Sequence, residues 1–281
     1  MTKVMIVAHH QRADAASLAA DAAAWLTEHG HVPFMPAEDA NVLRLDHLAL
    51  EVADPELVLS LGGDGTMLRS FQLLDGREVP VIGVNVGMLG YLTEVEPAGI
   101  LDALARFFAG DFDLERRMML AVHVIRRDGS RLGPMRALNE AVLEKEESGH
   151  TVRLHVAIDG ASFTTYAADG LIVATPTGST AYSFSARGPV VSPTHRALLL
   201  TPVSPHMLFD RALVLDPREE IVVDVAGHRP VALTLDGRRV AGLSEGDTVR
   251  CTEADASALF VRFGRRRFHQ ILKGKFGLTD R

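Results

Sequence analysis

The hydrophobic pattern of this chain changes near residue 115, and this change most constrains the fold. Before it, apolar runs at residues 4–7, 57–61 and 79–86 alternate with helical patterns, of which the longest covers residues 13–29. Strands that alternate with helices predict a parallel sheet with helices packed on it. We therefore expect an N-terminal α/β domain over residues 1–115.

Beyond residue 115 the hydrophobic pattern mostly repeats every two residues. Val152, Leu154 and Val156 alternate with other residue types, as in a strand with one buried face. Hairpin turns are indicated at Asp128-Gly129, Asp159-Gly160 and Asp236-Gly237. We expect a β-rich, antiparallel, sandwich-like domain over residues 116–264. Residues 268–275 have helical spacing, and we expect residues 265–281 to join the first domain.

The overall charge and the cysteine content narrow the class of protein. With 29 Lys and Arg against 36 Asp and Glu, the net charge is −7, whereas proteins that coat nucleic acid are usually basic. A single cysteine cannot form an intrachain disulfide, which fits a reducing compartment. No apolar run is long enough to span a bilayer. We expect a cytoplasmic protein that binds neither nucleic acid nor membrane.

The first motif with chemical meaning is Gly62-Gly63-Asp64-Gly65-Thr66, between a predicted strand and a predicted helix. Glycines allow a close backbone approach to phosphate oxygens, and amides at a helix start favour anions. A carboxylate there would repel phosphate unless Asp64 accepts a proton from an attacking hydroxyl or helps to hold magnesium. The alternative is a plain turn in which Asp64 caps the helix. No Gly-Lys-Ser/Thr follows, so this is not a Walker loop.

The second motif covers residues 169–182. An apolar strand over residues 171–174 ends in a turn rich in hydroxyl groups, and we expect a short helix from near Ser179 to Gly188-Pro189. Several hydroxyls and a glycine at a helix start suit sugar hydroxyls or phosphate. An ordinary helix cap would need only one Ser or Thr.

The third motif is Asn139-Glu140, which we place inside an apolar strand over residues 137–143. A buried polar pair must be hydrogen-bonded, and an amide beside a carboxylate can bind a base edge or the hydroxyls of a ribose. A solvent-facing position is a reasonable alternative for Glu140.

Together these motifs resemble the NAD kinase family, and the resemblance runs from about residue 57 to the C-terminus. Residues 85–93 and 201–206 also match segments of that family. The glycine-rich element alone is not specific, because diacylglycerol and sphingosine kinases carry a similar one. Residues 169–182 are much more specific.

The resemblance implies an enzyme that phosphorylates the adenosine-ribose 2′-hydroxyl of NAD to give NADP. It implies ATP or polyphosphate as donor, Mg²⁺ carried with the donor, and a homodimer or homotetramer. Asp64 would be the base, and no protein residue is assigned as a metal ligand. The substrate- and nucleotide-binding residues would be Gly62, Gly63, Gly65, Thr66, Tyr91, Asn139, Glu140, Asp169, Thr177, Thr180, Ala181, Tyr182 and Ser185.

Tyr91 matches a position usually held by Phe that packs on the adenine. Asn139 and Glu140 would hold the ribose and its neighbours, and Asp169 would contact the nicotinamide end. The remaining residues from Thr177 onward would line the nucleotide pocket, some of them from a neighbouring subunit.

Two positions depart from the family pattern. Arg187 stands where Gly is common, so it either adds a charge near the pocket or points to solvent. Met88 stands where a polar residue is common. His9 and His10 follow the first strand and could touch phosphate, but a surface loop explains them equally well, so we do not assign them to the site.

Two other functions stay open at this stage. A lipid or sphingoid-base kinase would share the glycine-rich loop, but the polar segment over residues 169–182 suits a sugar better than an acyl chain. An NADP-sensing module without enzymatic activity would keep the pocket but would not need Asp64.

Overall fold

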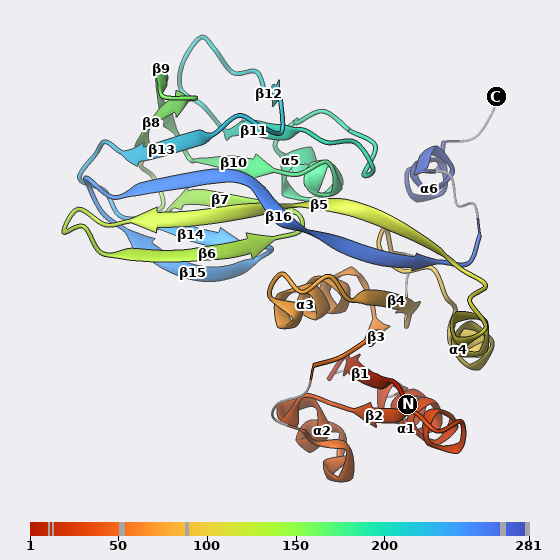
Figure 1. Cartoon of the computed structure of the whole chain (residues 1–281). Helices are drawn as coiled ribbons and strands as arrows, with labels where there is room; N and C mark the ends of the chain where they lie inside the picture. Colours follow the sequence, from red (N-terminus) through yellow and green to blue (C-terminus); the bar gives the residue numbers. More distant parts are fainter. Residues whose placement is uncertain (11, 13, 51–53, 88–89, 265–267, 279–281) are drawn as a thin grey trace. The chain divides into compact units, whose positions relative to one another are not determined.

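The computed structural model describes residues 1–10, 12, 14–50, 54–87, 90–264 and 268–278, so Met88 lies outside the described residues. The chain forms two compact units (Figure 1). One comprises Met1–Arg116 with Ala258–Arg281, and the other comprises Arg117–Ser257. Two long strands, β5 (Asp113–Ile125) and β16 (Thr248–Arg262), run from one unit into the other.

The N-terminal unit has a parallel sheet in the order β2-β1-β3-β4-β16. Its strands are β1 (Lys3–Ala8), β2 (Val32–Phe34), β3 (Leu57–Gly62), β4 (Pro80–Asn85) and the end of β16. Its helices are α1 (Ala15–Glu28), α2 (Ala37–Leu43), α3 (Asp64–Leu74), α4 (Ile100–Phe108) and α6 (Phe268–Lys275), with 3-10 turns η1 (Asp46–Leu48) and η2 (Pro97–Gly99).

The sequence accounts for these elements locally. β1 and β3 are almost continuously apolar, as expected of strands covered on both faces. In α1 the buried residues are Ala15, Ala19, Ala22, Ala23 and Leu26, a helical stripe facing the sheet. The helix stops before Gly30, whose φ of 78° lies in the left-handed region.

The β-rich unit contains two sheets. The strand pairs in them whose residue-by-residue pairing is defined are antiparallel. One has the order β16-β13-β8-β9, with β5 joining β16 to β6; the other has the order β12-β11-β10-β7-β14-β15. The strands not yet given bounds are β6 (Arg131–Ala137), β7 (Glu140–Lys145), β8 (Val152–Ile158), β9 (Ala161–Ala168), β10 (Gly170–Ala174), β11 (Leu198–Val203), β12 (Leu213–Leu215), β13 (Ile221–Val225), β14 (Val231–Leu235) and β15 (Arg238–Leu243).

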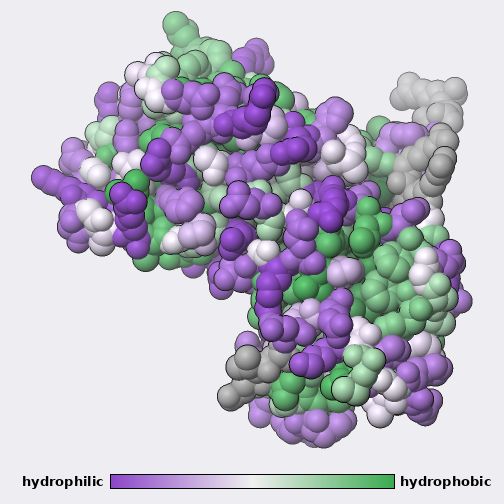
Figure 2. Space-filling view, viewed as in Figure 1, coloured by the Kyte–Doolittle hydropathy of each residue, from purple (hydrophilic) through white to green (hydrophobic). Residues whose placement is uncertain are grey.

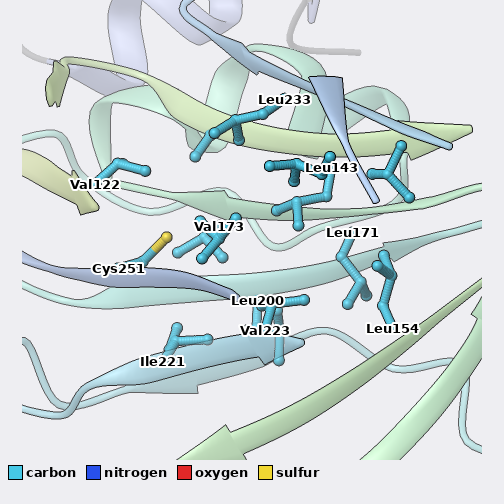
Figure 3. Close-up of a cluster of buried hydrophobic side chains, with 14 of the residues drawn as sticks. Val122, Leu143, Leu154, Leu171, Val173, Leu200, Ile221, Val223, Leu233 and Cys251 are labelled. Carbon is cyan, nitrogen blue, oxygen red and sulfur yellow. The ribbon is translucent and has the colours of Figure 1, made fainter. Parts of the chain in front are cut away.

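The core of this unit is aliphatic. Leu143, Leu171 and Val173 from one sheet pack with Leu154 and Val223 from the other, and all are fully buried (Figure 3). The two inner faces therefore form one hydrophobic core. The expected fold class, an α/β unit with a parallel sheet and a β-rich antiparallel unit, is confirmed.

All three predicted hairpin turns occur. The hairpin β8–β9 turns at Asp159 and Gly160, and β14–β15 turns at Asp236 and Gly237. In both pairs the two residues have φ between 47° and 77°, the conformation that Asp-Gly favours in two-residue hairpins. Asp128-Gly129 lies between β5 and β6.

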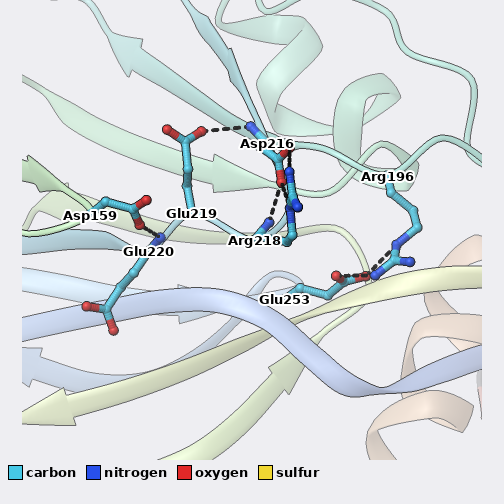
Figure 4. A network of polar contacts seen from close by, with 7 residues as sticks. All are labelled: Asp159, Arg196, Asp216, Arg218, Glu219, Glu220 and Glu253. Carbon is cyan, nitrogen blue, oxygen red and sulfur yellow. Dashed lines mark hydrogen bonds and ion pairs between the residues drawn. The ribbon is translucent and has the colours of Figure 1, made fainter.

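A network of polar contacts supports the turn between β12 and β13 (Figure 4). The Asp216 carboxylate accepts hydrogen bonds from the backbone and side chain of Arg218, which lower the pKa of Asp216 to about 2. The backbone N–H of Glu220 donates to Asp159 at 2.8 Å. These contacts fix loops and take no part in the site described below.

On the face seen in Figure 2, hydrophilic residues cover much of the surface, and hydrophobic residues lie among them. Among the described residues, no helix combines the length and the apolar character needed to cross a membrane.

Candidate active site

The loop of the first motif joins β3 to α3, as the sequence predicted. Gly62 ends β3, and a Cβ built on it would lie 2.1 Å from the Thr66 hydroxyl, so only glycine fits there. A Cβ on Gly63 or Gly65 would meet nothing within 4 Å. Internal packing therefore requires glycine at the first position, whereas space is open around the other two.

Asp64 begins α3, and its carboxylate is held by the segment that follows β4. The backbone N–H of Tyr91 donates to Oδ2 at 2.9 Å, and that of Leu92 donates to Oδ1 at 2.9 Å. A Cβ on Gly90 would lie 2.1 Å from Oδ1, so glycine lets this segment close around the carboxylate. An ionised carboxylate offers about four acceptor positions, so two amides leave capacity for a further donor.

Tyr91 lies next to this carboxylate. Partial burial and the charge of Asp64 raise the pKa of its hydroxyl, which therefore stays protonated near neutral pH. The ammonium group of Lys275, from α6, lies 4.2 Å from the centroid of the Tyr91 ring, which is a cation–π contact. The ring is thus fixed beside Asp64 as a flat surface.

Asn85 is a residue of this region that the site prediction did not include. It ends β4 and is 4% exposed. Its side-chain nitrogen donates to the Gly87 carbonyl at 3.4 Å, and no described residue bonds its buried Oδ1. The sequence does indicate this residue: Asn85 is a single amide at the carboxyl end of a parallel strand, and ligands bind at that end of the strands in α/β folds.

In the β-rich unit, Asn139 does not lie inside a strand as predicted. It occupies a bend between β6, which ends at Ala137, and β7, which begins at Glu140. The cause is Asp236, whose carboxylate accepts the backbone N–H groups of Leu138, Asn139 and Glu140 at 2.8, 2.7 and 3.1 Å. The hairpin turn of β14–β15 therefore shapes the third motif.

Glu140 is buried rather than facing solvent. Its side chain is 6% exposed, and its Oε2 has no hydrogen-bond partner among the described residues. Burial and the nearby charge of Asp236 raise its pKa from 4.5 to about 8, although the backbone N–H of Tyr182 bonds the carboxylate and opposes the shift. Near neutral pH Glu140 is mostly protonated, so it can donate as well as accept.

The hydroxyls of the second motif mostly serve the turn itself. Thr175 donates to the Leu138 carbonyl at 2.6 Å, and Ser179 donates to the Pro176 carbonyl at 2.7 Å. A Cβ on Gly178 would lie 2.2 Å from the Asn139 carbonyl, so this glycine lets the second and third motifs touch. The buried Thr177 hydroxyl has no partner among the described residues.

The helix of this motif is shorter than predicted. A 3-10 turn η3 (Thr177–Thr180) is followed, across Ala181, by α5 (Tyr182–Ser185), which ends well before Gly188. Arg187 then has φ of 66°, a left-handed backbone that favours glycine.

Asp169 and Tyr182 complete this part of the site. Asp169 pairs with Lys145, whose ammonium is 2.6 Å from Oδ1; the site prediction did not include this lysine. Partial burial and the charges of Glu144 and Asp169 raise the pKa of the Tyr182 hydroxyl. Tyr182, Ser185 and Arg187 also line one cavity of about 430 Å³.

The structure thus gathers the predicted residues into two groups. In the N-terminal unit it places Tyr91 and the glycine loop around Asp64. In the β-rich unit it joins Asn139 and Glu140 to the turn over residues 175–182, with Asp169 beside Tyr182.

The N-terminal unit has a parallel sheet with an aspartate in a glycine-rich loop, and the β-rich unit has a turn rich in hydroxyl groups. This combination defines a class of phosphotransferases. Two family models match the chain: the ATP-NAD kinase N-terminal domain over residues 44–112 and the ATP-NAD kinase C-terminal domain over residues 138–263. The NAD kinase of Heliobacterium modesticaldum is 40% identical over 98% of both chains, and that of Syntrophotalea carbinolica is 35% identical over 100% of both. The chain belongs to the NAD kinase family.

Solved structures agree with the fold. Yeast NADH kinase complexed with NADH superposes with a TM-score of 0.91 at 24% identity, covering 100% of this chain and 89% of the other. An Archaeoglobus fulgidus NAD kinase in complex with ATP gives a TM-score of 0.76 at 23% identity, covering both chains completely.

Proposed function

We propose that this protein transfers a phosphoryl group from ATP to the 2′-hydroxyl of the adenosine ribose of NAD, giving NADP. The observation that carries this proposal is Asp64, a carboxylate fixed by two backbone amides 2.9 Å away, beside open glycines at a helix start. Transfer of a phosphoryl group to a hydroxyl needs a proton acceptor close to where a polyanion can bind, and this loop offers both.

The proposed reaction is direct in-line transfer. Asp64 accepts the proton of the attacking hydroxyl through its remaining acceptor positions. The amides around Gly63 and Gly65 face the phosphates of the donor and stabilise charge on the transferred group. No covalent nucleophile is required.

Asn139 and Glu140 are proposed to hold the dinucleotide. The buried Oε2 of Glu140 has no partner among the described residues, and a hydroxyl of the ligand, which can both donate and accept, would satisfy it. The bend fixed by Asp236 keeps the Asn139 backbone in place while its amide, which both donates and accepts, contacts the substrate. The dinucleotide would thus supply the hydrogen bonds that the protein leaves open.

The other residues have supporting roles in this proposal. Tyr91 packs against the adenine with its fixed ring, and Asp169 contacts the nicotinamide end. The pocket is lined by Thr177, Thr180, Ala181, Tyr182 and Ser185.

Magnesium would enter with the donor. Mg²⁺ usually keeps several waters and binds one or two carboxylates together with substrate phosphates. Among the described residues no three His, Cys, Asp or Glu are grouped to hold a metal ion, and Asp64 is the carboxylate of the glycine loop. This donor set fits an ion carried by the triphosphate, which would neutralise charge on the phosphates when bound.

Assembly and location are also part of the proposal. Exposed apolar side chains such as Phe184, Val190 and Val214 of the β-rich unit suit contact with another copy, in a homodimer or homotetramer. The single cysteine, which is buried and free, suits a reducing cytoplasm.

Steady-state kinetics in which each substrate is varied separately test the site assignment. Asn139→Ala and Glu140→Ala should each raise the KM for NAD, by a loss of about 1–3 kcal/mol for each buried group left unpaired, with little change in the KM for ATP. Asn41→Ala, at an exposed position on α2, is the control. Loss of ATP affinity with NAD affinity intact would mean that the dinucleotide has been assigned to the donor's place.

Asp64→Asn separates catalysis from binding. It should lower kcat by about 10²- to 10⁴-fold while NAD binding, measured by calorimetry, stays unchanged. Normal turnover in this variant would remove Asp64 from the mechanism and favour a module that only binds nucleotide.

A further inference from the structure

The last helix of the chain, α6, brings a charged side chain to the ring of Tyr91. The ammonium group of Lys275 lies 4.2 Å from the centroid of that ring. Both residues belong to the N-terminal unit, although the whole β-rich unit separates them in the sequence. Neither the site prediction nor the mechanism above assigns a role to any residue of α6.

The ammonium group of Lys275 is committed to no other partner. It has three N–H donors, and no described residue accepts a hydrogen bond from it or forms an ion pair with it. Lys273 and Lys275 both lie in the last turn of α6, where a positive charge is favourable at the negative end of the helix. That effect is common to both lysines, so it does not explain why Lys275 covers the ring.

The helix that carries Lys275 contributes little to the hydrophobic core. No residue of α6 is buried, and Phe268, Ile271 and Leu272 are only partly covered. The Lys275 side chain itself is exposed. A substitution at this position therefore removes the contact with Tyr91 without opening a cavity, so a change in ligand binding can be traced to the contact.

The contact gives the two faces of the Tyr91 ring different surroundings. A cation is attracted to the face of an aromatic ring, so the ammonium group covers one of the two faces. The backbone of Tyr91 is held separately, because its N–H donates to the Asp64 carboxylate at 2.9 Å. Lys275 therefore fixes the orientation of a ring whose backbone is already in place.

We propose that Lys275 is a positioning residue for the adenine of the dinucleotide: it covers one face of the Tyr91 ring and leaves the opposite face for the base. The proposal rests on the function proposed above, in which Tyr91 packs against the adenine. Aromatic rings prefer offset stacking, and a ring of fixed orientation offers that geometry before the ligand arrives. Less side-chain freedom is then lost on binding, which raises the affinity for NAD.

Calorimetric titration of the whole protein with NAD tests this role without turnover. Lys275→Met removes the charge but keeps an unbranched side chain, and it should raise the Kd for NAD by about twofold to fivefold. Lys275→Arg should restore the affinity, because a guanidinium also stacks on an aromatic face. Lys273→Met is the matched control: it removes the same charge from the same helical turn and should leave the Kd unchanged.

A double-mutant cycle traces the effect to the ring. Tyr91→Phe keeps the ring, so Lys275→Met should weaken NAD binding by the same factor in that background. Tyr91→Leu removes the ring, so Lys275→Met should then cause no further loss. ADP-ribose, which lacks the nicotinamide, should show the same losses as NAD. A loss restricted to NAD would place the effect at the other end of the dinucleotide and overturn the proposal.

Steady-state kinetics distinguish a positioning role from general damage to the site. Lys275→Met should raise the KM for NAD while kcat and the KM for ATP stay unchanged, because Tyr91 holds Asp64 through its backbone. Unchanged NAD binding would show that the contact has no role, and tighter binding would show that the ammonium covers the face that the base needs. Either result overturns the proposal and leaves the proposed function standing. If the wild-type protein binds no NAD, the proposed function and this role both fail.

Discussion

The ionisation of Glu140 should make the stability of this protein fall as pH rises. The folded state holds this carboxyl with a pKa of about 8, against 4.5 for an unperturbed group. Between these values the folded state retains a proton that the unfolded state has released, so each rise in pH favours unfolding. Below about pH 4.5 both states are protonated and above about pH 8 both are ionised, so the contribution is flat outside this window.

The size of the effect follows from the same values. One pKa unit corresponds to about 1.4 kcal/mol, so the whole window amounts to a loss on the order of 5 kcal/mol. Glu140→Gln keeps the shape of the side chain but cannot ionise, so it should remove this pH dependence. Near pH 7 the variant should be more stable than the wild type by about 3 kcal/mol.

Urea unfolding followed by circular dichroism, at several values between about pH 5 and pH 8, measures this slope. Glu144→Gln is the matched control, because Glu144 lies on the same strand and is only partly buried. The free energy of unfolding of this variant should change with pH in the same way as that of the wild type. Equal slopes for the wild type and Glu140→Gln would show that Glu140 ionises normally in the folded protein, and the argument from burial would then fail.

Three further substitutions test single contacts. Gly90→Ala would place a Cβ against the Asp64 carboxylate; it should lower kcat by about 100-fold with little change in the KM for NAD, and unchanged kcat would mean that this carboxylate needs no fixed position. Asp236→Asn removes the charge next to Glu140, so the pH slope of stability should become shallower while the KM for NAD rises; an unchanged slope would leave burial as the only cause. Arg187→Gly should raise the free energy of unfolding by about 1 kcal/mol, because the residue has a left-handed backbone. The same variant should weaken the use of polyphosphate or the inhibition by NADP. Unchanged kinetics with every donor would mean that the charge of Arg187 affects neither.

Local signals explain why much of this fold could be predicted. Glycines between an apolar strand and a helical pattern identified the loop at Asp64, because few other patterns join a strand to a helix so closely. The Asp-Gly pairs identified hairpins because both residues tolerate positive φ. In these cases the determining residues lie within a few positions of the element they define.

The features that escaped prediction depend on distant partners. The bend at Asn139 exists because of Asp236, 97 residues further along the chain. The carboxylate of Asp39 is buried because α2 and α3 bring Arg69 against it, and nothing in the local sequence indicates this. Local sequence patterns thus predict candidate residue types for the site but not the contacts that orient them.

The N-terminal unit is built from two separate parts of the chain, and this affects its synthesis on the ribosome. Its sheet takes its last strand from β16, where Leu259 and Phe260 pair in parallel with Pro80 and Val81. Those residues emerge only after the entire β-rich unit, which is continuous over Arg117–Ser257, has been translated. Nascent chains therefore carry β4 with an open edge for most of their synthesis, and the unit that bears Asp64 is the last to be completed.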